Sequence, residues 1–305
     1  MPSPTVSQED TVQANLPQHV AVQLAGALVQ ARADELGVRS LILKGSAATI
    51  HGYRPVLDSS DVDVLLERSD ARRVIAALSH AGWRTRRTAP APRQFELHSE
   101  TLYHPEWPCD IDVHWRYPGF FSAPEVVFDA LWAESEFAVI AGRRARITGV
   151  VGTALVLAVH ALRDPQRARS EADLASVGER LTDDDLASRF LATAIVLRAQ
   201  YPLRDLLERT GAQSVEDDLT SEERAAWDLE VESSGSTTLH WYIAFTSAPW
   251  SRRPAVALSA ARALALSARG SSIGVATRAD STSRKLREAV VEIRRLHRRR
   301  RSRRE

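Results

Sequence analysis

Acidic and apolar residues alternate in the same way in two segments that lie far apart in this chain. The first segment reads Asp61-Val62-Asp63-Val64, and the second reads Asp110-Ile111-Asp112-Val113-His114. Side chains of a β-strand point alternately to its two faces, so each segment presents its acids on one face and its apolar residues on the other. The pattern therefore predicts a sheet that is apolar on one face and carries a group of acids on the other.

Carboxylates gathered in this way repel one another unless a cation lies among them. Their hard oxygen atoms are the ligands that Mg²⁺ prefers, and bound magnesium suits phosphate chemistry. A single Asp-Val-Asp would most often be a solvent-exposed strand end. Two such strands, together with the Gly45-Ser46 pair upstream, favour a metal site over solvent-exposed acids without a functional role.

The Gly45-Ser46 pair predicts a turn into a short helix. Glycine lets the backbone approach a phosphate closely, and the Ser46 hydroxyl with the N–H groups of a helix N-terminus could then bind the β- and γ-phosphates. Lys44 precedes this turn and is one of only two lysines, the other being Lys285. Lys44 could meet a phosphate or pair with a carboxylate of the site, and the alternative is an exposed surface lysine.

These residues resemble the pattern of polymerase-beta-type nucleotidyltransferases, in which a Gly-Ser turn, an Asp-x-Asp strand and a later acidic strand follow one another. Within that superfamily, Leu43-Lys44-Gly45, the Asp-x-Asp at 61–63 and the Asp-x-His-Trp at 112–115 resemble the bacterial family of uncharacterised nucleotidyltransferases. The resemblance extends over residues 20–180 and implies an α/β (α+β) chain. Its N-terminal nucleotidyltransferase fold would have a mixed sheet flanked by helices, followed by a helical C-terminal domain.

The resemblance also implies roles for individual residues. Asp61 and Asp63 would hold two Mg²⁺ ions, and a third carboxylate would bind the catalytic ion and accept the proton of the acceptor. Either Asp110 or Asp112 could be that third acid, and Asp112 is preferred because the family's acid stands just before its His-Trp pair. His114 would orient the nucleotide or a carboxylate, with a purely structural histidine as the alternative.

Two further positions match the family more loosely. The family often has a histidine in the helix after the sheet and an aspartate beyond it, which correspond to His160 and Asp173. The alternative for His160 is a structural role, because a histidine in an apolar helix is usually a buried core residue. The family also has an arginine about four residues before its first Asp. Leu57 stands there in this chain, so either Arg54 serves instead or a phosphate contact is lost.

The implied activity is Mg²⁺-dependent transfer of NMP from an NTP to an acceptor, with release of pyrophosphate. The acceptor could be a small molecule, a peptide or protein, or RNA, since the fold does not choose among them. The alternative is a catalytically degenerate protein that only binds nucleotide or nucleic acid.

The composition is that of a soluble globular protein, with 44% hydrophobic and 26% charged residues over 305 positions, enough for two domains. Cys109 is the only cysteine, which excludes an internal disulfide and a multi-cysteine zinc site. The first fifteen residues are polar, which predicts no signal peptide, and the apolar stretch 150–162 is too short to span a bilayer. We therefore expect a cytoplasmic protein.

The net charge of +1 conceals an asymmetry along the chain. Residues 294–305 contain eight arginines and one glutamate, which leaves 32 basic against 38 acidic residues in the rest. Such a tail could contact RNA or another polyanion, or it could be a solvated terminus.

The chain divides into four predicted parts: a disordered N-terminus over 1–18, a nucleotidyltransferase domain over 19–148, a helical domain over 149–293 and the Arg-rich tail over 294–305. The spacing of apolar residues and glycines predicts a helix over 20–36, which ends at Gly37, and another over 151–162. Two hairpins are predicted, at 95–104 and at 137–147.

Overall fold

The structure is a computed structural model, and it describes residues 16–55, 59–86, 97–165, 167–209, 216–233 and 237–270. Most of the predicted N-terminal segment lies outside these ranges, and the first helix begins at Gln18. The Arg-rich tail also lies outside the described residues, so its predicted contact with RNA or another polyanion stays a prediction. The four domain boundaries likewise stay predictions.

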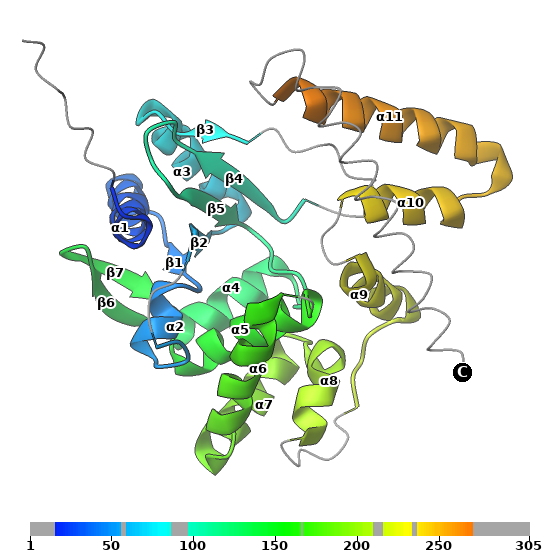
Figure 1. The fold of residues 1–305 in the computed structure, drawn as a ribbon. Coiled ribbons are helices and arrows are strands. Elements are labelled where there is room, and N and C mark those ends of the chain that lie inside the picture. Colours follow the sequence, from blue (N-terminus) through cyan, green and yellow to red (C-terminus); the bar gives the residue numbers. More distant parts are fainter. Residues whose placement is uncertain are drawn as a thin grey trace, which may run out of the picture.

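A mixed sheet of seven strands forms the centre of the described N-terminal half, in the order β3-β4-β5-β2-β1-β7-β6 (Figure 1). Strands β2 and β5 pair in parallel, as do β1 and β7, and the remaining neighbours are antiparallel. The expected mixed sheet is therefore confirmed. The strands are β1 Leu41–Ile42, β2 Asp61–Leu65, β3 Arg84–Thr85, β4 Ser99–Tyr103, β5 Asp110–His114, β6 Glu136–Ile140 and β7 Arg143–Ile147.

Helices α1 (Gln18–Leu36) and α3 (Arg68–His80) pack against one face of this sheet. Their apolar residues form one core cluster with the inward residues of β2 and β5, namely Val62, Val64, Ile111 and Val113. Because these residues alternate with the acids of the same strands, the acids point to the opposite face of the sheet. The short helix α2 (Ser46–Ile50) follows β1, and α4 (Pro124–Ala133) follows β5.

Helix α5 (Val150–Arg163) is buried along most of its length and packs on the acidic face of the sheet. One hydrophobic cluster joins Leu41, Leu43 and Leu65 of the sheet to α5 and to helices of the C-terminal half. The remaining helices are α6 Ala168–Arg180, α7 Asp184–Val196, α8 Gln200–Arg209, α9 Ser221–Ser233, α10 Thr237–Ser247 and α11 Arg253–Gly270 (Figure 1). No helix in the described part of the chain is both long enough and apolar enough to cross a membrane.

The second predicted hairpin is confirmed as β6 and β7, but the first is wrong. Residues 99–103 form one continuous strand, β4, whose two neighbours are β3 and β5. The predicted hairpin placed its turn at Ser99 and Glu100, yet these residues pair with His114 and Val113 of β5. A strand between two partners is held by its ladders on both sides, so local polarity did not decide its structure.

Candidate active site

Parallel pairing of β2 with β5 brings the two acidic segments side by side. Asp61 lies opposite Asp110 in this register, and Asp63 lies opposite Asp112. Since the side chains of paired residues share a face of the sheet, all four acids start from the same face. The sequence predicted the alternation within each strand, and the register supplies the contact between the strands.

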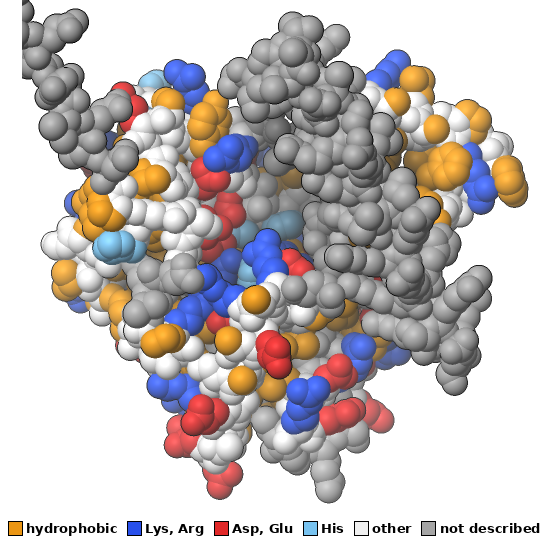
Figure 2. Space-filling view, viewed as in Figure 1, with side chains coloured by type: hydrophobic (Ala, Val, Ile, Leu, Met, Phe, Trp, Pro, Cys, Tyr) orange, Lys and Arg blue, Asp and Glu red, His pale blue; other side chains and the backbone are white. Residues whose placement is uncertain are grey.

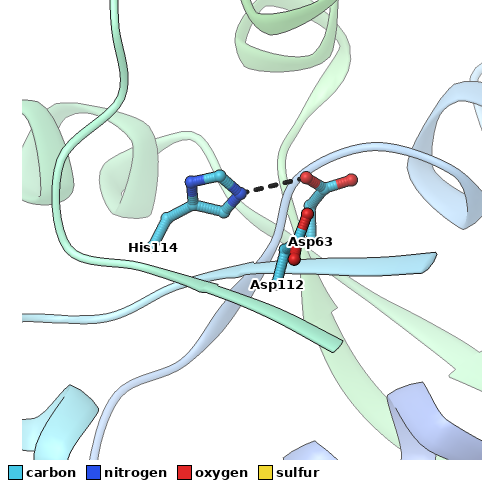
Figure 3. Close-up of side chains that lie close together, drawn as sticks. All are labelled: Asp63, Asp112 and His114. Atoms are coloured by element: carbon cyan, nitrogen blue, oxygen red, sulfur yellow. Dashed lines mark hydrogen bonds and ion pairs between the residues drawn. The ribbon is translucent and has the colours of Figure 1, made fainter. Parts of the chain in front are cut away.

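The carboxylate of Asp63 is the most buried of the group, with 3% of the residue exposed. Its Oδ1 accepts a hydrogen bond from Lys44 Nζ at 3.0 Å. The same Oδ1 accepts a second one from His114 Nε2, also at 3.0 Å (Figure 3). Burial raises the pKa of Asp63, but the charges and hydrogen bonds of Lys44 and His114 outweigh it, so that the pKa lies well below its usual range. Asp63 is therefore a permanent anion at the base of the site.

Lys44 is one of the cations that compensate this anion. Its side chain is 11% exposed, and its Nζ lies 3.5 Å from His160 Nδ1 as well as contacting Asp63. Burial lowers the pKa of Lys44, yet Asp63, Tyr117 and Asp61 raise it further, so the ammonium stays charged. Burial and the charge of Lys44 lower the pKa of His160 to about 2, so its neutral ring can accept a hydrogen bond from Lys44.

Asp112 and Asp61 lack a comparable compensation. The Oδ1 atom of Asp112 is buried and has no hydrogen-bond partner in the described part of the protein. Burial and the charge of Asp63 raise the pKa of both carboxyls. The charge of Lys44 and the 3.1 Å hydrogen bond from Ser59 Oγ to Asp61 Oδ1 oppose the rise only in part for Asp61, as a hydrogen bond with Thr101 does for Asp112. The cluster therefore carries uncompensated negative charge on the cavity side of the sheet.

The structure separates the two candidates for the third carboxylate. Asp110 forms a two-pronged ion pair with Arg86, whose Nε and Nη2 lie 2.8 and 2.7 Å from its carboxylate oxygens. Asp112 instead lies beside Asp63 and His114, and one ligand atom from each of these three residues falls within 4.8 Å of the others (Figure 3). The geometry thus favours Asp112, as the Asp-x-His-Trp spacing did.

Asp61, Asp63 and Asp112 line a cavity of about 290 Å³ between the sheet and the helices α5 and α6, whereas Asp110 does not. Acidic, basic and histidine side chains meet in the hollow at the centre of Figure 2. Of the residues singled out in the sequence, the cavity is lined by Lys44, Arg54, Asp61, Asp63, Asp112, His114, His160 and Asp173.

Gly45 and Ser46 do not line this cavity. Gly45 has φ +60°, a conformation that favours glycine, and Ser46 is the first residue of α2. The predicted turn into a helix is therefore present, whereas the predicted contact of Gly45 and Ser46 with phosphates stays a prediction.

Arg54 and Asp173 form an ion pair at the edge of the cavity. Arg54 donates from Nε and Nη2 to the two carboxylate oxygens of Asp173, at 2.8 and 2.6 Å. Both side chains are nearly buried, with 11% and 3% exposed. The pair ties the loop before β2 to α6, while Leu57, the residue at the family's arginine position, lies outside the described residues.

Three arginines that the sequence analysis did not single out also line the cavity. Arg163 ends α5, while Arg167 and Arg169 lie at the start of α6. The only available sequence signal was their clustering in the segment 163–169, and nothing local indicates that this segment faces the acids of β2 and β5.

The donor set fits a divalent cation. Asp63 and Asp112 supply hard oxygen atoms within 4.8 Å of each other and of a nitrogen of His114, whereas Asp61 lines the same wall outside this close group. The buried, unpartnered Oδ1 of Asp112 is an acceptor that a cation would satisfy. Lys44 neutralises only part of the charge of these three carboxylates. The residues present can therefore hold a metal ion, although they do not by themselves select magnesium.

A family described as "Uncharacterised nucleotidyltransferase" has a sequence model that matches residues 8–211 of this protein. The chain belongs to that family. This membership confirms the resemblance drawn from the motifs. It also confirms the expected enzyme class, a nucleotidyltransferase, without identifying the acceptor substrate. A comparison with curated proteins found no match.

Solved structures similar to this nucleotidyltransferase are remote in sequence. The antibiotic-resistance factor ANT(2'')-Ia aligns with 16% identity and a TM-score of 0.40, over 64% of this chain and 97% of that chain. The same factor in complex with adenylyl-2''-tobramycin gives 16% identity and a TM-score of 0.39, over 56% and 95%. An antigenic nucleotidyltransferase-like protein from Paracoccidioides brasiliensis gives 11% identity and a TM-score of 0.37, over 62% and 93%.

Proposed function

We propose that this protein transfers NMP from an NTP to an acceptor hydroxyl in a Mg²⁺-dependent reaction. The observation that carries the proposal is the meeting of Asp61, Asp63 and Asp112 on one wall of a cavity whose other wall is basic. A cavity with this charge distribution suits a metal-bound triphosphate, because the cations meet the acids and the phosphates meet the arginines.

The reaction follows from these roles. The acceptor oxygen forms a bond to the α-phosphorus, the bond from this phosphorus to the oxygen that bridges to the β-phosphorus breaks, and pyrophosphate leaves with the electron pair. The acceptor's proton passes to the carboxylate of Asp112, which lies on the same cavity wall as Asp61 and Asp63. When bound at Asp61, Asp63 and Asp112, Mg²⁺ ions neutralise charge on the attacking and leaving oxygens.

Lys44 and His114 act on the site through Asp63. Both donate to its Oδ1, which fixes the carboxylate in one orientation and leaves its other oxygen for a ligand. In this proposal they are positioning residues. The use of magnesium and the cytoplasmic location are predictions from the sequence, which leaves the choice of NTP and the identity of the acceptor open.

The test is ³¹P NMR and mass spectrometry of the protein with each NTP and Mg²⁺, in the presence of candidate acceptors. We expect release of pyrophosphate and a product heavier by one NMP, both lost in Asp61→Asn/Asp63→Asn. Asp110→Asn is the matched control, since Asp110 lies on the same sheet face but pairs with Arg86 away from the cavity. Full activity in the double variant would show that the assigned site is wrong.

The alternative, a degenerate protein that only binds nucleotide, predicts a different result. It predicts Mg²⁺-dependent NTP binding that the double variant weakens, with no pyrophosphate released with any acceptor. The presence of all three carboxylates, Asp61, Asp63 and Asp112, in the cavity argues against degeneracy.

A further inference from the structure

The two walls of the cavity carry opposite charges and come from different parts of the chain. The acidic wall is formed by β2 and β5 of the sheet. The opposite wall comes from the end of α5 and the start of α6, where Arg163 and Arg167 line the cavity. Blue and red side chains accordingly face the same hollow at the centre of Figure 2.

Arg163 is half-buried and forms no ion pair or hydrogen bond with any residue that the structure describes. The positive charge of Arg163 acts on two neighbouring groups. It lowers the pKa of His160, and it partly offsets the rise that burial causes in the pKa of Glu230. Glu230 influences Arg163 only from beyond ion-pair distance, so the guanidinium on the cavity wall can still bind an anionic ligand. The planar guanidinium of arginine is suited to two-pronged binding of phosphate.

Arg167 lies close to the same wall and is more exposed. Its Nε contacts Asp164 Oδ2 at 2.7 Å, and its side chain is 63% exposed. That ion pair uses one edge of the guanidinium, and no other ion pair of Arg167 occurs among the described residues. Arg167 can therefore add a second cation once a ligand lies against Arg163.

We propose that Arg163, assisted by Arg167, binds the pyrophosphate end of the nucleotide, which is the group that leaves in the reaction. The inference rests on the proposed nucleotidyl transfer. The α-phosphate must lie at the acids, where the acceptor's proton is removed, so the β- and γ-phosphates extend toward the opposite wall. Arg163 and Arg167 line that wall, so they are placed to bind these two phosphates.

The experiment measures binding of inorganic pyrophosphate and of AMP, each with Mg²⁺, by isothermal titration calorimetry. Arg163→Gln removes the charge, and Arg163→Lys keeps it without the planar donor pair. We expect Arg163→Gln to raise the Kd for pyrophosphate by about 10- to 100-fold, the effect of losing a charge-assisted contact, and Arg163→Lys to give an intermediate value. AMP, which carries only the α-phosphate, should bind equally well to all variants.

Arg72→Gln is the matched control. Arg72 is an exposed arginine of α3 that has no ion pair or hydrogen bond with the described residues. The substitution Arg72→Gln removes the same charge from the protein without changing the cavity. The Kd of this variant for pyrophosphate should therefore stay within about twofold of the wild-type value. Thermal unfolding followed by circular dichroism checks that every variant is folded.

Three results would overturn the inference: no binding of pyrophosphate by the wild type, equal Kd values for Arg163→Gln and Arg72→Gln, or equal weakening of AMP and pyrophosphate. The last would place Arg163 at the α-phosphate or at an anionic acceptor. None of these results bears on NMP transfer, which is judged by product formation. Conversely, pyrophosphate binding that depends on Arg163 without NMP transfer would support this inference and reject the proposed function.

Discussion

Lys44 and Asp63 form an ion pair with 3.0 Å between Nζ and Oδ1, and this contact joins the residue before the Gly-Ser turn to the second acid of β2. The two side chains are 11% and 3% exposed. The pair explains how a sheet can hold several carboxylates on one face without any ion bound. Because both charges are largely buried, removing either residue should destabilise the site.

Replacing Lys44 by methionine should destabilise the metal-free protein. The change keeps the volume of the side chain but leaves the buried Asp63 anion without its main cation, at a cost of about 3 kcal/mol. Urea unfolding at pH 7 measures the loss, and Arg72→Met, which alters an exposed arginine, should cost less than about 0.5 kcal/mol. Added Mg²⁺ should stabilise Lys44→Met more than the wild type. Equal stability of Lys44→Met and the wild type would contradict the importance of this pair.

Metal binding should distinguish Asp112 from Asp110. Asp112→Asn removes the charge of an acid whose Oδ1 is unpartnered, and we expect the affinity for Mn²⁺ to fall by at least about tenfold. Asp110→Asn should leave the affinity for Mn²⁺ nearly unchanged, because the carboxylate of Asp110 is already paired with Arg86. The signal of free Mn²⁺ in electron paramagnetic resonance measures both values. Equal losses in the two variants would contradict the assignment of the third carboxylate.

The raised pKa of Asp112 predicts a pH-dependent stability. A carboxyl whose pKa is raised in the folded state contributes stability below its unfolded pKa and loses it as the pH rises through the folded value. At pH 7 and without metal, Asp112→Asn should therefore be more stable than the wild type by about 0.5–2 kcal/mol.

This advantage should shrink as the pH falls toward the ordinary pKa of aspartate, about 3.9. Asp63 does not interfere, because its pKa is lowered and its carboxylate stays charged in this window. Urea unfolding from pH 5 to pH 8 without metal tests the sign. An advantage of Asp112→Asn that grows as the pH falls would refute the explanation from burial and the charge of Asp63.

The ion pair between Arg54 and Asp173 should show strong coupling in a double-mutant cycle. Arg54→Met or Asp173→Leu alone leaves one nearly buried charge unpaired, and each should cost about 3 kcal/mol. The double variant leaves no unpaired charge, so it should cost less than the sum of the two single changes. Free energies of unfolding from urea titrations give the coupling. Additive losses would show that the two residues do not stabilise each other.

Several elements could be predicted from the sequence because their signals are local. The helix α1 ends at Gly37, where φ is +64°, and the turn at Gly142 joins β6 to β7. The alternation in β2 and β5 predicted which side chains share a face. Helix α4 was missed although Pro124 and Glu125 in its first turn are local helix signals. Strand β4 was broken into a hairpin because pairing with β3 and β5 decided a structure that local composition left open.

The sequence by itself determined that two strands present acids on one face, that a Gly-Ser turn precedes them, and that the chain belongs among nucleotidyltransferases. The first two features depend on residues a few positions apart, whose geometry follows from the periods of strands and helices, and the third comes from the resemblance of these motifs to a known family. Tertiary structure decided that Asp112 rather than Asp110 lies beside Asp63, that Lys44 pairs with Asp63, and that Arg163 faces the acids. Each of these depends on strand register or on which helix covers the sheet, and such long-range contacts are fixed by packing of the whole core.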